Sequence, residues 1–197
     1  MKICVFGASS DQIGESFCLA ARRVGEQMAE SGHTLVFGGG CTGLMGECAR
    51  GALSRCGEVI GIAPRYFDEP GVLMEDCTRF FFTETMSERK KKMEALAEGF
   101  LVLPGGIGTF DEFFETLTLL QVGQLAAPMV LLNTDGYYAP LRALLEHTVS
   151  AGFLSADVLG LCPLCGTPEE ALAALTATGG RVEPRRLADY NRRAQGR

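Results

Sequence analysis

The stretch GFLVLPGGIGTFDE, residues 99–112, carries in succession the marks of a strand, a turn and the start of a helix. GFLVL is too short and too apolar for anything other than a buried strand, and Pro104 ends that strand because proline has no N–H to donate. Gly105, Gly106 and Gly108 allow positive φ angles and close approach, so successive N–H groups can point at one anion. The stretch therefore predicts a phosphate-binding turn that opens a helix.

Thr109 and Glu112 are spaced as the two members of a capping box. In that interpretation the Thr109 hydroxyl accepts a hydrogen bond from a backbone amide, and the Glu112 carboxylate reaches back to the start of the helix. Capping alone does not call for three glycines within the four residues before it. Glu112 thus has two interpretations, a helix cap and a carboxylate that faces a ligand.

Strand-like apolar runs alternate with amphipathic helical patterns on both sides of this stretch. Helices are expected over residues 15–30, 44–55, 87–98 and 138–150 and after Gly108; strands are expected at KICVFGA (2–8), TLVF (34–37), EVIGIAP (58–64), RFFFT (79–83) and PMVLLN (128–133), before a closing strand and a short helix. This order predicts an α/β fold, a Rossmann-like doubly wound parallel sheet with helices on both faces. Residues 65–77 are irregular and too long for an ordinary connection, which makes them a candidate lid or substrate loop.

The chain is expected to form one catalytic domain, residues 1–177, followed by an Arg-rich C-terminal tail, residues 178–197. The net charge is −6, but the tail carries six arginines against Glu183 and Asp189, so the preceding residues carry −10. An acidic body argues against a nucleic-acid partner, and the tail is interpreted as a frayed or docking segment. The sequence contains no apolar run long enough to span a membrane and no signal-peptide pattern, so no membrane contact and a cytoplasmic location are expected.

The cysteines and histidines do not form a metal-binding pattern. Cys162 and Cys165 make a CxxC, but no second pair and no nearby histidine completes a zinc site. His33 and His147 are far apart in the sequence. We therefore expect no metal.

A second glycine-rich turn, GGGCTG at residues 38–43, follows the expected strand TLVF and matches GxGxxG. A dinucleotide site would also have an acidic residue at the end of the next strand, but that strand ends in Ala63 and Pro64, which disfavours NAD. Neither turn is a Walker A motif, because no Lys-Ser or Lys-Thr pair follows its last glycine. Two turns of this kind favour a mononucleotide or a sugar phosphate.

The segment TETMSERKKKM, residues 83–93, supplies the positive charge. Thr85 and Glu88 form a capping box, which places Arg89 in the first turns of a helix, where the macrodipole disfavours cations. The helical spacing puts Arg89 on one face with Met86, Lys90 and Met93. A guanidinium on that face can point into the same cleft as the N–H groups of the PGGIGT turn. The alternative is a solvated basic face, the interpretation adopted for Lys91 and Lys92.

The chain resembles the LOG family of cytokinin riboside 5'-monophosphate phosphoribohydrolases in the order and spacing of four segments: GGGCTGLMG (38–46), VIGIAP (59–64), MSERK (86–90) and PGGIGTFDE (104–112). The resemblance continues through NTDGYY (133–138) and AGFLS (151–155), and so covers nearly everything before the tail. Members of this family are often labelled lysine decarboxylases. That chemistry requires a cofactor such as pyridoxal phosphate on a buried lysine, and the sequence offers no pattern for one, so we reject the label.

The resemblance implies hydrolysis of the N-glycosidic bond of an adenosine 5'-monophosphate, plain or N6-substituted, to the free base and ribose 5-phosphate, without a cofactor. The essential Arg and Glu of the family map onto Arg89 and Glu112. Cleavage develops oxocarbenium character on the ribose, so Glu112 would stabilise that charge and orient or deprotonate the attacking water. Arg89 and Lys90 would fix the nucleotide, residues 106–109 would hold its phosphate, and Thr118 matches a family threonine on the same helix.

Further candidates for ribose or base contacts are a serine after the first strand and a glutamate in the irregular segment. The complete set of expected substrate-binding residues is Ser9, Glu69, Met86, Lys90, Gly105, Gly106, Ile107, Gly108, Thr109, Phe110, Asp111, Thr118, Gly39, Gly40 and Gly43.

The resemblance also implies a homodimer whose active site is completed by the partner subunit. Phe113, Phe114, Leu117 and Leu120 are candidates for that interface or for the core. A different class of function stays open: a nucleotide- or molybdenum-cofactor-binding or sensing protein of related fold without catalysis. Binding a phosphate does not require a carboxylate, so the presence of both Arg89 and Glu112 favours the enzyme.

Overall fold

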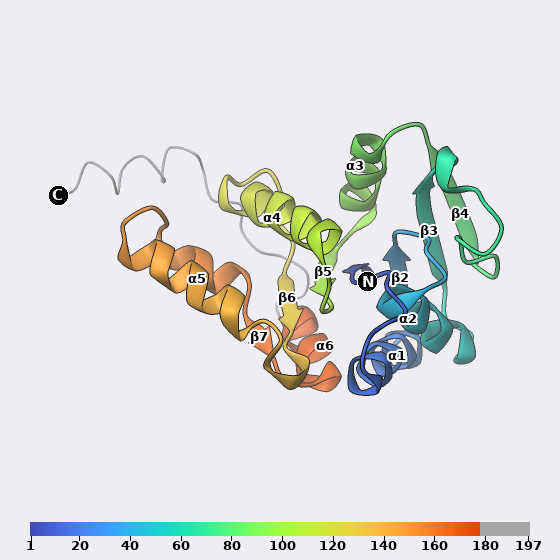
Figure 1. The fold of residues 1–197 in the computed structure, drawn as a ribbon, viewed down its shortest axis with the longest axis horizontal. Helices are drawn as coiled ribbons and strands as arrows, with labels where there is room; N and C mark the ends of the chain where they lie inside the picture. The colour runs from blue at the N-terminus through green and yellow to red at the C-terminus, as the bar shows by residue number, and fades with distance from the viewer. Residues whose placement is uncertain (178–197) are drawn as a thin grey trace.

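The protein folds around one seven-stranded sheet whose strands are all parallel, in the order β4-β3-β2-β1-β5-β6-β7 (Figure 1). The computed structural model describes residues 1–177; the Arg-rich tail lies outside the described residues. The strands are β1 (Lys2–Phe6), β2 (Thr34–Phe37), β3 (Val59–Pro64), β4 (Arg79–Thr83), β5 (Gly99–Val102), β6 (Met129–Leu132) and β7 (Leu164–Cys165).

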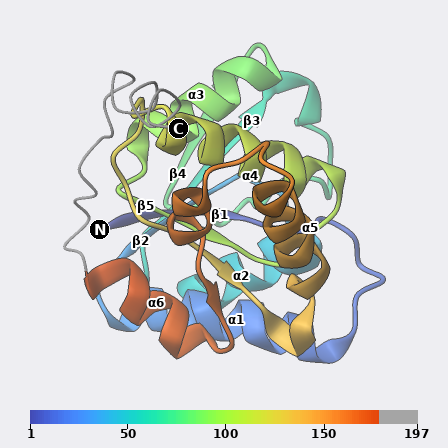
Figure 2. The same cartoon turned by 90° about the vertical axis from the view of Figure 1, so that its left-hand side faces the viewer.

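Six α-helices in the described residues cover both faces of the sheet: α1 (Glu15–Glu30), α2 (Gly43–Ser54), α3 (Met86–Leu96), α4 (Ile107–Gln121), α5 (Ala139–Ser150) and α6 (Pro168–Ala177). Helices α1, α2 and α6 lie on one face, and α3, α4 and α5 lie on the other (Figures 1 and 2). Short 3-10 turns occur at Arg65–Phe67, Thr134–Gly136 and Ala156–Leu161. The predicted fold class is confirmed.

Alternation along the central strand assigns its side chains to two separate cores. Ile3 and Val5 pack in the core beneath α1, α2 and α6, while Cys4 and Phe6 pack in the core beneath α3, α4 and α5. All four side chains are buried, because a parallel strand with helices on both faces has no solvent side. This explains why the strands appear in the sequence as continuous apolar runs.

The chain order creates a switch point between β1 and β5. From β1 the chain moves to β2 on one side, and it later returns to place β5 on the other side, so the turns after β1 and β5 diverge at the carboxyl edge. Ligands of open α/β sheets bind at such a point.

The irregular segment at residues 65–77 folds back over this edge. An isolated antiparallel bridge joins Leu73 to Gly40, and the N–H of Met74 donates to the carbonyl of Gly39 at 2.8 Å. The segment therefore lies against the glycine-rich turn that follows β2. None of the helices in residues 1–177 combines the length and the apolar character needed to cross a bilayer.

Candidate active site

A cleft of about 560 Å³ lies at the carboxyl edge of the sheet, at the switch point. Its walls come from the turns after β1, β2 and β5, from the start of α3 and α4, and from the irregular segment. Ser9, Gly40, Met86, Arg89 and Glu112 all line it, as do Gly106, Ile107, Gly108, Thr109 and Asp111. Segments that are distant in the sequence thus meet in one cavity.

A buried ion pair forms part of the cleft wall. Arg89 on α3 donates from Nη1 to Oε1 of Glu112 on α4 at 2.7 Å, and the two side chains are 7% and 8% exposed. The Nε of Arg89 also donates to the carbonyl of Ile62 at the end of β3, at 3.1 Å. Because a buried charge is costly unless it is paired and hydrogen-bonded, these contacts fix the guanidinium in one orientation.

Gly38 makes room for that guanidinium. A Cβ atom at position 38 would lie 1.8 Å from Nη2 of Arg89, too close for any real contact. The first glycine of the GGGCTG turn therefore serves the ion pair. The sequence motif contained this residue, but its role depends on α3, which follows almost fifty residues later.

The Glu112 carboxyl has a pKa above its ordinary value. Burial raises this pKa, and the charge and hydrogen bond of Arg89 oppose the rise without cancelling it. Desolvation therefore makes the carboxylate a stronger base than an exposed glutamate, while Arg89 favours its ionised form. A carboxylate with these properties can orient and deprotonate a water molecule.

Helix α4 begins at the cleft with its first N–H groups unused. Gly106 is the N-cap, so the N–H groups of residues 106–109 precede the first intrahelical bond, which runs from Phe110 N to the carbonyl of Gly106 at 2.9 Å. Among residues 1–177, no hydrogen bond of the structure uses these four N–H groups, and no side chain caps the helix. Together with the helix dipole they form an anion-binding group.

Of the two interpretations of Glu112, the helix cap formed with Thr109 is wrong. The helix starts at Ile107, so Thr109 is its third residue, and the Glu112 carboxylate pairs with Arg89. Thr109 instead packs against the backbone of Gly105, where an added Cβ would lie 2.1 Å from its Oγ1. At the other predicted capping box, the N–H of Glu88 donates to Oγ1 of Thr85 at 3.1 Å, while the Glu88 carboxylate accepts from the N–H of Glu84 at 3.0 Å, one residue before the N-cap.

A family model described as "Possible lysine decarboxylase" matches residues 45–175. The chain is 36% identical over 174 residues to the cytokinin riboside 5'-monophosphate phosphoribohydrolase of Rhodococcoides fascians, and the match covers 88% of each protein. It is 34% identical over 174 residues to the cytokinin riboside 5'-monophosphate phosphoribohydrolase LOG of Oryza sativa subsp. japonica, covering 88% of this chain and 72% of that protein. The chain belongs to the LOG family.

Solved structures of other proteins share the fold of this LOG-family chain. The molybdenum cofactor binding protein from Rippkaea orientalis superposes with a TM-score of 0.69 at 21% identity, covering 90% of this chain and 96% of that one. The molybdenum cofactor carrier protein from Chlamydomonas reinhardtii gives a TM-score of 0.69 at 22% identity, covering 91% and 98%. At these identities the likeness concerns the fold alone.

The GGGCTG turn of the LOG-family chain is a closed turn, which here means that N–H groups at the start of its helix already donate to acceptors within the protein. The N–H of Gly43 donates to Oδ1 of Asp11 at 3.0 Å, and the N–H of Leu44 donates to the carbonyl of Ala8 at 2.9 Å. Gly39 and Gly43 have φ angles of 77° and 60°, and a Cβ at either would meet neighbouring atoms at 2.6 Å or less. Both glycines shape the turn, and neither lines the cleft.

Five of the predicted substrate-binding residues face a neighbouring hollow of about 660 Å³ on α4, namely Lys90, Ile107, Phe110, Asp111 and Thr118. The Lys90 ammonium pairs with Glu115 at 2.5 Å and with Asp111 at 3.0 Å, which raises its pKa. The Thr118 hydroxyl donates to the carbonyl of Phe114 at 2.7 Å. Of these five, Ile107 and Asp111 also line the cleft, and Glu69 lies exposed without lining it.

Several residues that line the cleft had not been predicted. Phe67, Val72 and Leu73 come from the irregular segment, and Met45 comes from α2. The length of that segment indicated a substrate loop, but only the bridge to Gly40 shows which of its side chains turn toward the cavity. They give the cleft an apolar side.

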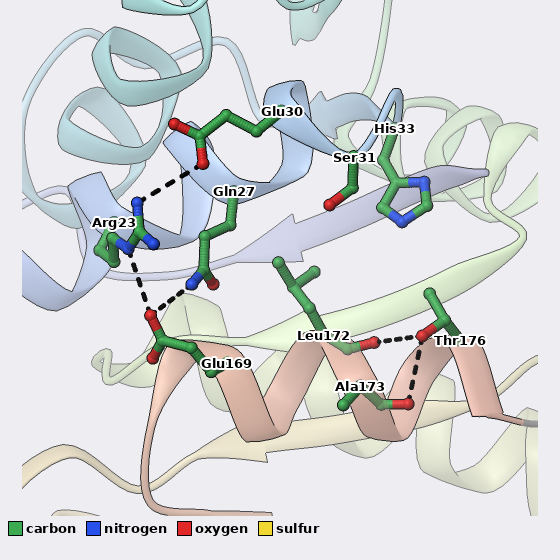
Figure 3. A pocket seen from close by; sticks show the side chains of 9 residues that line it. All are labelled: Arg23, Gln27, Glu30, Ser31, His33, Glu169, Leu172, Ala173 and Thr176. Carbon is green, nitrogen blue, oxygen red and sulfur yellow. Dashed lines mark hydrogen bonds and ion pairs between the residues drawn. The ribbon is translucent and has the colours of Figure 1, made fainter.

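A second hollow of about 390 Å³ lies between α1 and α6 (Figure 3). Arg23 pairs there with Glu169 at 3.2 Å and with Glu30 at 3.6 Å, and the Gln27 amide donates to Glu169. Ser31 and His33, which line it, precede β2, so the hollow lies at the amino edge of the sheet, opposite the cleft. Its charged side chains pair with one another, and the position is not one where open α/β sheets bind ligands.

Proposed function

We propose that this protein hydrolyses the N-glycosidic bond of an adenosine 5'-monophosphate, plain or N6-substituted, and releases the base and ribose 5-phosphate. The observation that carries the proposal is the buried Arg89–Glu112 pair beside the open start of α4. The curated relatives of this LOG-family chain that carry the name cytokinin riboside 5'-monophosphate phosphoribohydrolase support it.

The geometry of α4 suits a nucleotide monophosphate. The unused amides lie at residues 106–109 and the carboxylate at residue 112, which at 1.5 Å per residue separates them by about 4.5 to 9 Å along the helix axis. This span is comparable to that of a ribose between its 5'-phosphate and its C1' carbon. A phosphate held by the amides thus brings the glycosidic bond toward Glu112.

Bond cleavage leaves the electron pair of the C1'–N bond on the base and positive charge on the ribose. Glu112 faces that charge as a carboxylate, and it takes a proton from the water whose oxygen bonds to C1'. That proton then neutralises the departing base. Arg89 keeps Glu112 ionised and oriented before the substrate arrives.

The apolar side of the cleft is the proposed place for the base. Phe67, Val72 and Met86 line it, and each is more than a third exposed. A purine with an apolar N6 substituent would cover these side chains better than plain AMP does. We therefore expect the N6-isopentenyl nucleotide to bind more tightly than AMP.

Two other functions fit the residues less well. A lysine decarboxylase would need a lysine in the cleft, but within the described residues none lines it, and Lys90 pairs with two carboxylates in the neighbouring hollow. Burying Glu112 carries the cost of desolvating its carboxylate, and a phosphate-binding protein without catalysis would have no need to bury it.

We also propose a homodimer in which a partner subunit covers α4 beside the cleft and completes the active site. Ile107 is 84% exposed and Phe114 40% exposed, and both line the hollow next to the cleft. Adjacent exposed apolar side chains are typical of an interface. Phe113, Leu117 and Leu120 are buried and belong to the core. The cytoplasmic location stays a prediction.

Light scattering of the purified protein tests the homodimer. The wild type should have twice the chain mass, and Phe114→Glu should convert it to a monomer with much lower activity. Phe153→Glu is the matched control, because Phe153 is 84% exposed but follows α5. A wild-type monomer at all concentrations would contradict the proposal.

Product analysis by chromatography tests the activity. The protein is incubated with AMP, with N6-isopentenyladenosine monophosphate and with the two unphosphorylated nucleosides. Release of free base from the monophosphates alone is the expected result, with the N6-substituted nucleotide preferred. If no base appears although the nucleotides raise the melting temperature, the protein binds nucleotides without cleaving them.

A further inference from the structure

Three consecutive carbonyls of the turn after β5 accept hydrogen bonds from other elements. The Tyr138 hydroxyl donates to the carbonyl of Leu103 at 2.6 Å, and the Tyr137 hydroxyl donates to the carbonyl of Gly105 at 2.6 Å. The carbonyl between them accepts the N–H of Ala8 at 3.1 Å. The three residues before the N-cap of α4 are therefore each fixed by a hydrogen bond that the carbonyl accepts from another element.

The bond from Tyr137 fixes the direction of an N–H group. In a planar trans peptide the C=O of one residue and the N–H of the next point in opposite directions. Anchoring the carbonyl of Gly105 thus aims the N–H of Gly106 away from Tyr137. Gly106 lines the cleft and Tyr137 does not. A peptide between two glycines can flip at little steric cost, so this orientation needs an anchor.

Tyr138 provides a natural contrast. The peptide that follows the carbonyl of Leu103 ends in Pro104, which has no N–H, so the Tyr138 hydroxyl aims no donor. Tyr138 is buried, at 1% exposure, and its hydroxyl satisfies a buried carbonyl. Its contribution is to stability.

The Tyr137 ring has two aromatic neighbours. It packs edge-on against Phe17 of α1 and against Tyr138, with ring centroids 6.0 Å and 5.0 Å away. The preceding turn is tied to α1 as well, since the Ser16 hydroxyl donates to Asp135 at 2.6 Å. The hydroxyl therefore has a defined position relative to the switch point.

We propose that Tyr137 is a positioning residue for phosphate recognition, which acts by holding the Gly105–Gly106 peptide so that the N–H of Gly106 faces the cleft. The inference rests on the proposed function, because that function places the substrate phosphate on residues 106–109. Tyr137 does not touch the substrate, and its hydroxyl works through one peptide plane.

Isothermal titration calorimetry with two ligands tests this role. Ribose 5-phosphate carries the phosphate, and adenosine probes the rest of the cleft. Tyr137→Phe should weaken ribose 5-phosphate binding roughly tenfold, since a charge-assisted hydrogen bond is lost, and leave adenosine binding within about twofold. Tyr138→Phe should leave both affinities within about twofold but lower the melting temperature more than Tyr137→Phe does.

A second readout does not depend on affinity. In amide NMR spectra, ribose 5-phosphate should shift the Gly106 signal in the wild type and in Tyr138→Phe, and shift it much less in Tyr137→Phe. Equal affinities for ribose 5-phosphate in Tyr137→Phe and the wild type, or an equal loss for both ligands, would overturn the inference.

Failure of the activity is a separate result. If the wild type releases no base but binds ribose 5-phosphate in a way that depends on Tyr137, the proposed hydrolysis fails and the positioning role stands. If the wild type does not bind ribose 5-phosphate, there is no phosphate to position and the inference falls.

Discussion

The two glycine-rich turns of this protein look alike in the sequence and behave differently in the structure. GGGCTG at residues 38–43 and PGGIGT at residues 104–109 each join a buried strand to a helix at the same edge of the sheet. At the first turn, Asp11 and the carbonyl of Ala8 take the helix amides. At the second, the carbonyls are anchored, and within residues 1–177 no group of the protein accepts a hydrogen bond from the amides of residues 106–109. Glycine spacing predicts a tight turn, and the tertiary neighbours decide whether the turn can bind an anion.

The largest effect should come from Glu112, the carboxylate of the open turn's helix. Glu112→Gln keeps the size of the side chain and a hydrogen bond to Arg89 but removes the carboxylate that accepts the proton of the water. The rate at which the nucleobase is released should therefore fall about a thousandfold. Chromatographic rates of base release measure this, with the melting temperature as a check on folding. Glu146→Gln, in an exposed pair on α5, is the matched control and should retain the wild-type rate. Retained activity in Glu112→Gln would remove the carboxylate from the mechanism.

Gly38 should have the next largest effect, because the closed turn makes room for Arg89 of the proposed active site. A methyl group at position 38 overlaps the guanidinium, so Gly38→Ala should displace Arg89 and lower kcat/KM about a hundredfold. Gly160→Ala is the control, since an added Cβ there meets no atom within 4 Å. If Gly38→Ala has normal kinetics, the ion pair tolerates displacement and its exact position does not matter.

The effect of pH on activity should be smaller than the effects of these two substitutions over the usual pH range. It should report the raised pKa of Glu112. Because the base must be ionised, kcat/KM should fall tenfold per pH unit below that pKa, with a midpoint above the ordinary glutamate value of 4.5. The raised pKa also means that Glu112 stabilises the fold most below its unfolded pKa, and that this stabilisation is lost as the pH rises through the folded pKa. A pH–rate profile and urea unfolding at several pH values measure both. An activity midpoint at or below 4.5 would contradict the assignment.

The fold was predictable because its determinants are local. Strand and helix periodicities predicted the α/β order, and glycine with proline marked the turns. The predicted helix limits differed from the observed ones by a residue or two. Helix α4 starts at Ile107 because Gly106 takes the extended N-cap conformation. The sequence signal for Arg89 was its position in the first turns of a helix, where the dipole disfavours a cation. In the structure this cation is paired with Glu112.

The unpredicted parts of the site depend on contacts between distant segments. The capping-box pattern of Thr109 and Glu112 was misleading because Arg89, 23 residues earlier, competes for the carboxylate. Lys90 was expected in the cleft, but Asp111 and Glu115 draw it into the next hollow. Asp11 carried no motif at all, since its importance appears only when the turn after β1 meets the start of α2.

Asp11 should have the smallest effect, and it tests the comparison most directly. Asp11→Ala removes the acceptor for the N–H of Gly43 and should lower the free energy of unfolding by about 1 kcal/mol, as for a lost helix cap, while Asp11→Asn should lower it less. Urea denaturation measures the change. Ribose 5-phosphate affinity should stay near the wild-type value, because the N–H groups of Gly43 and Leu44 already donate within the protein and neither residue lines the cleft. If Asp11→Ala instead weakens ribose 5-phosphate binding as much as Tyr137→Phe is expected to, then the turn after β2 contributes to the phosphate site, and the distinction between a closed and an open turn is wrong.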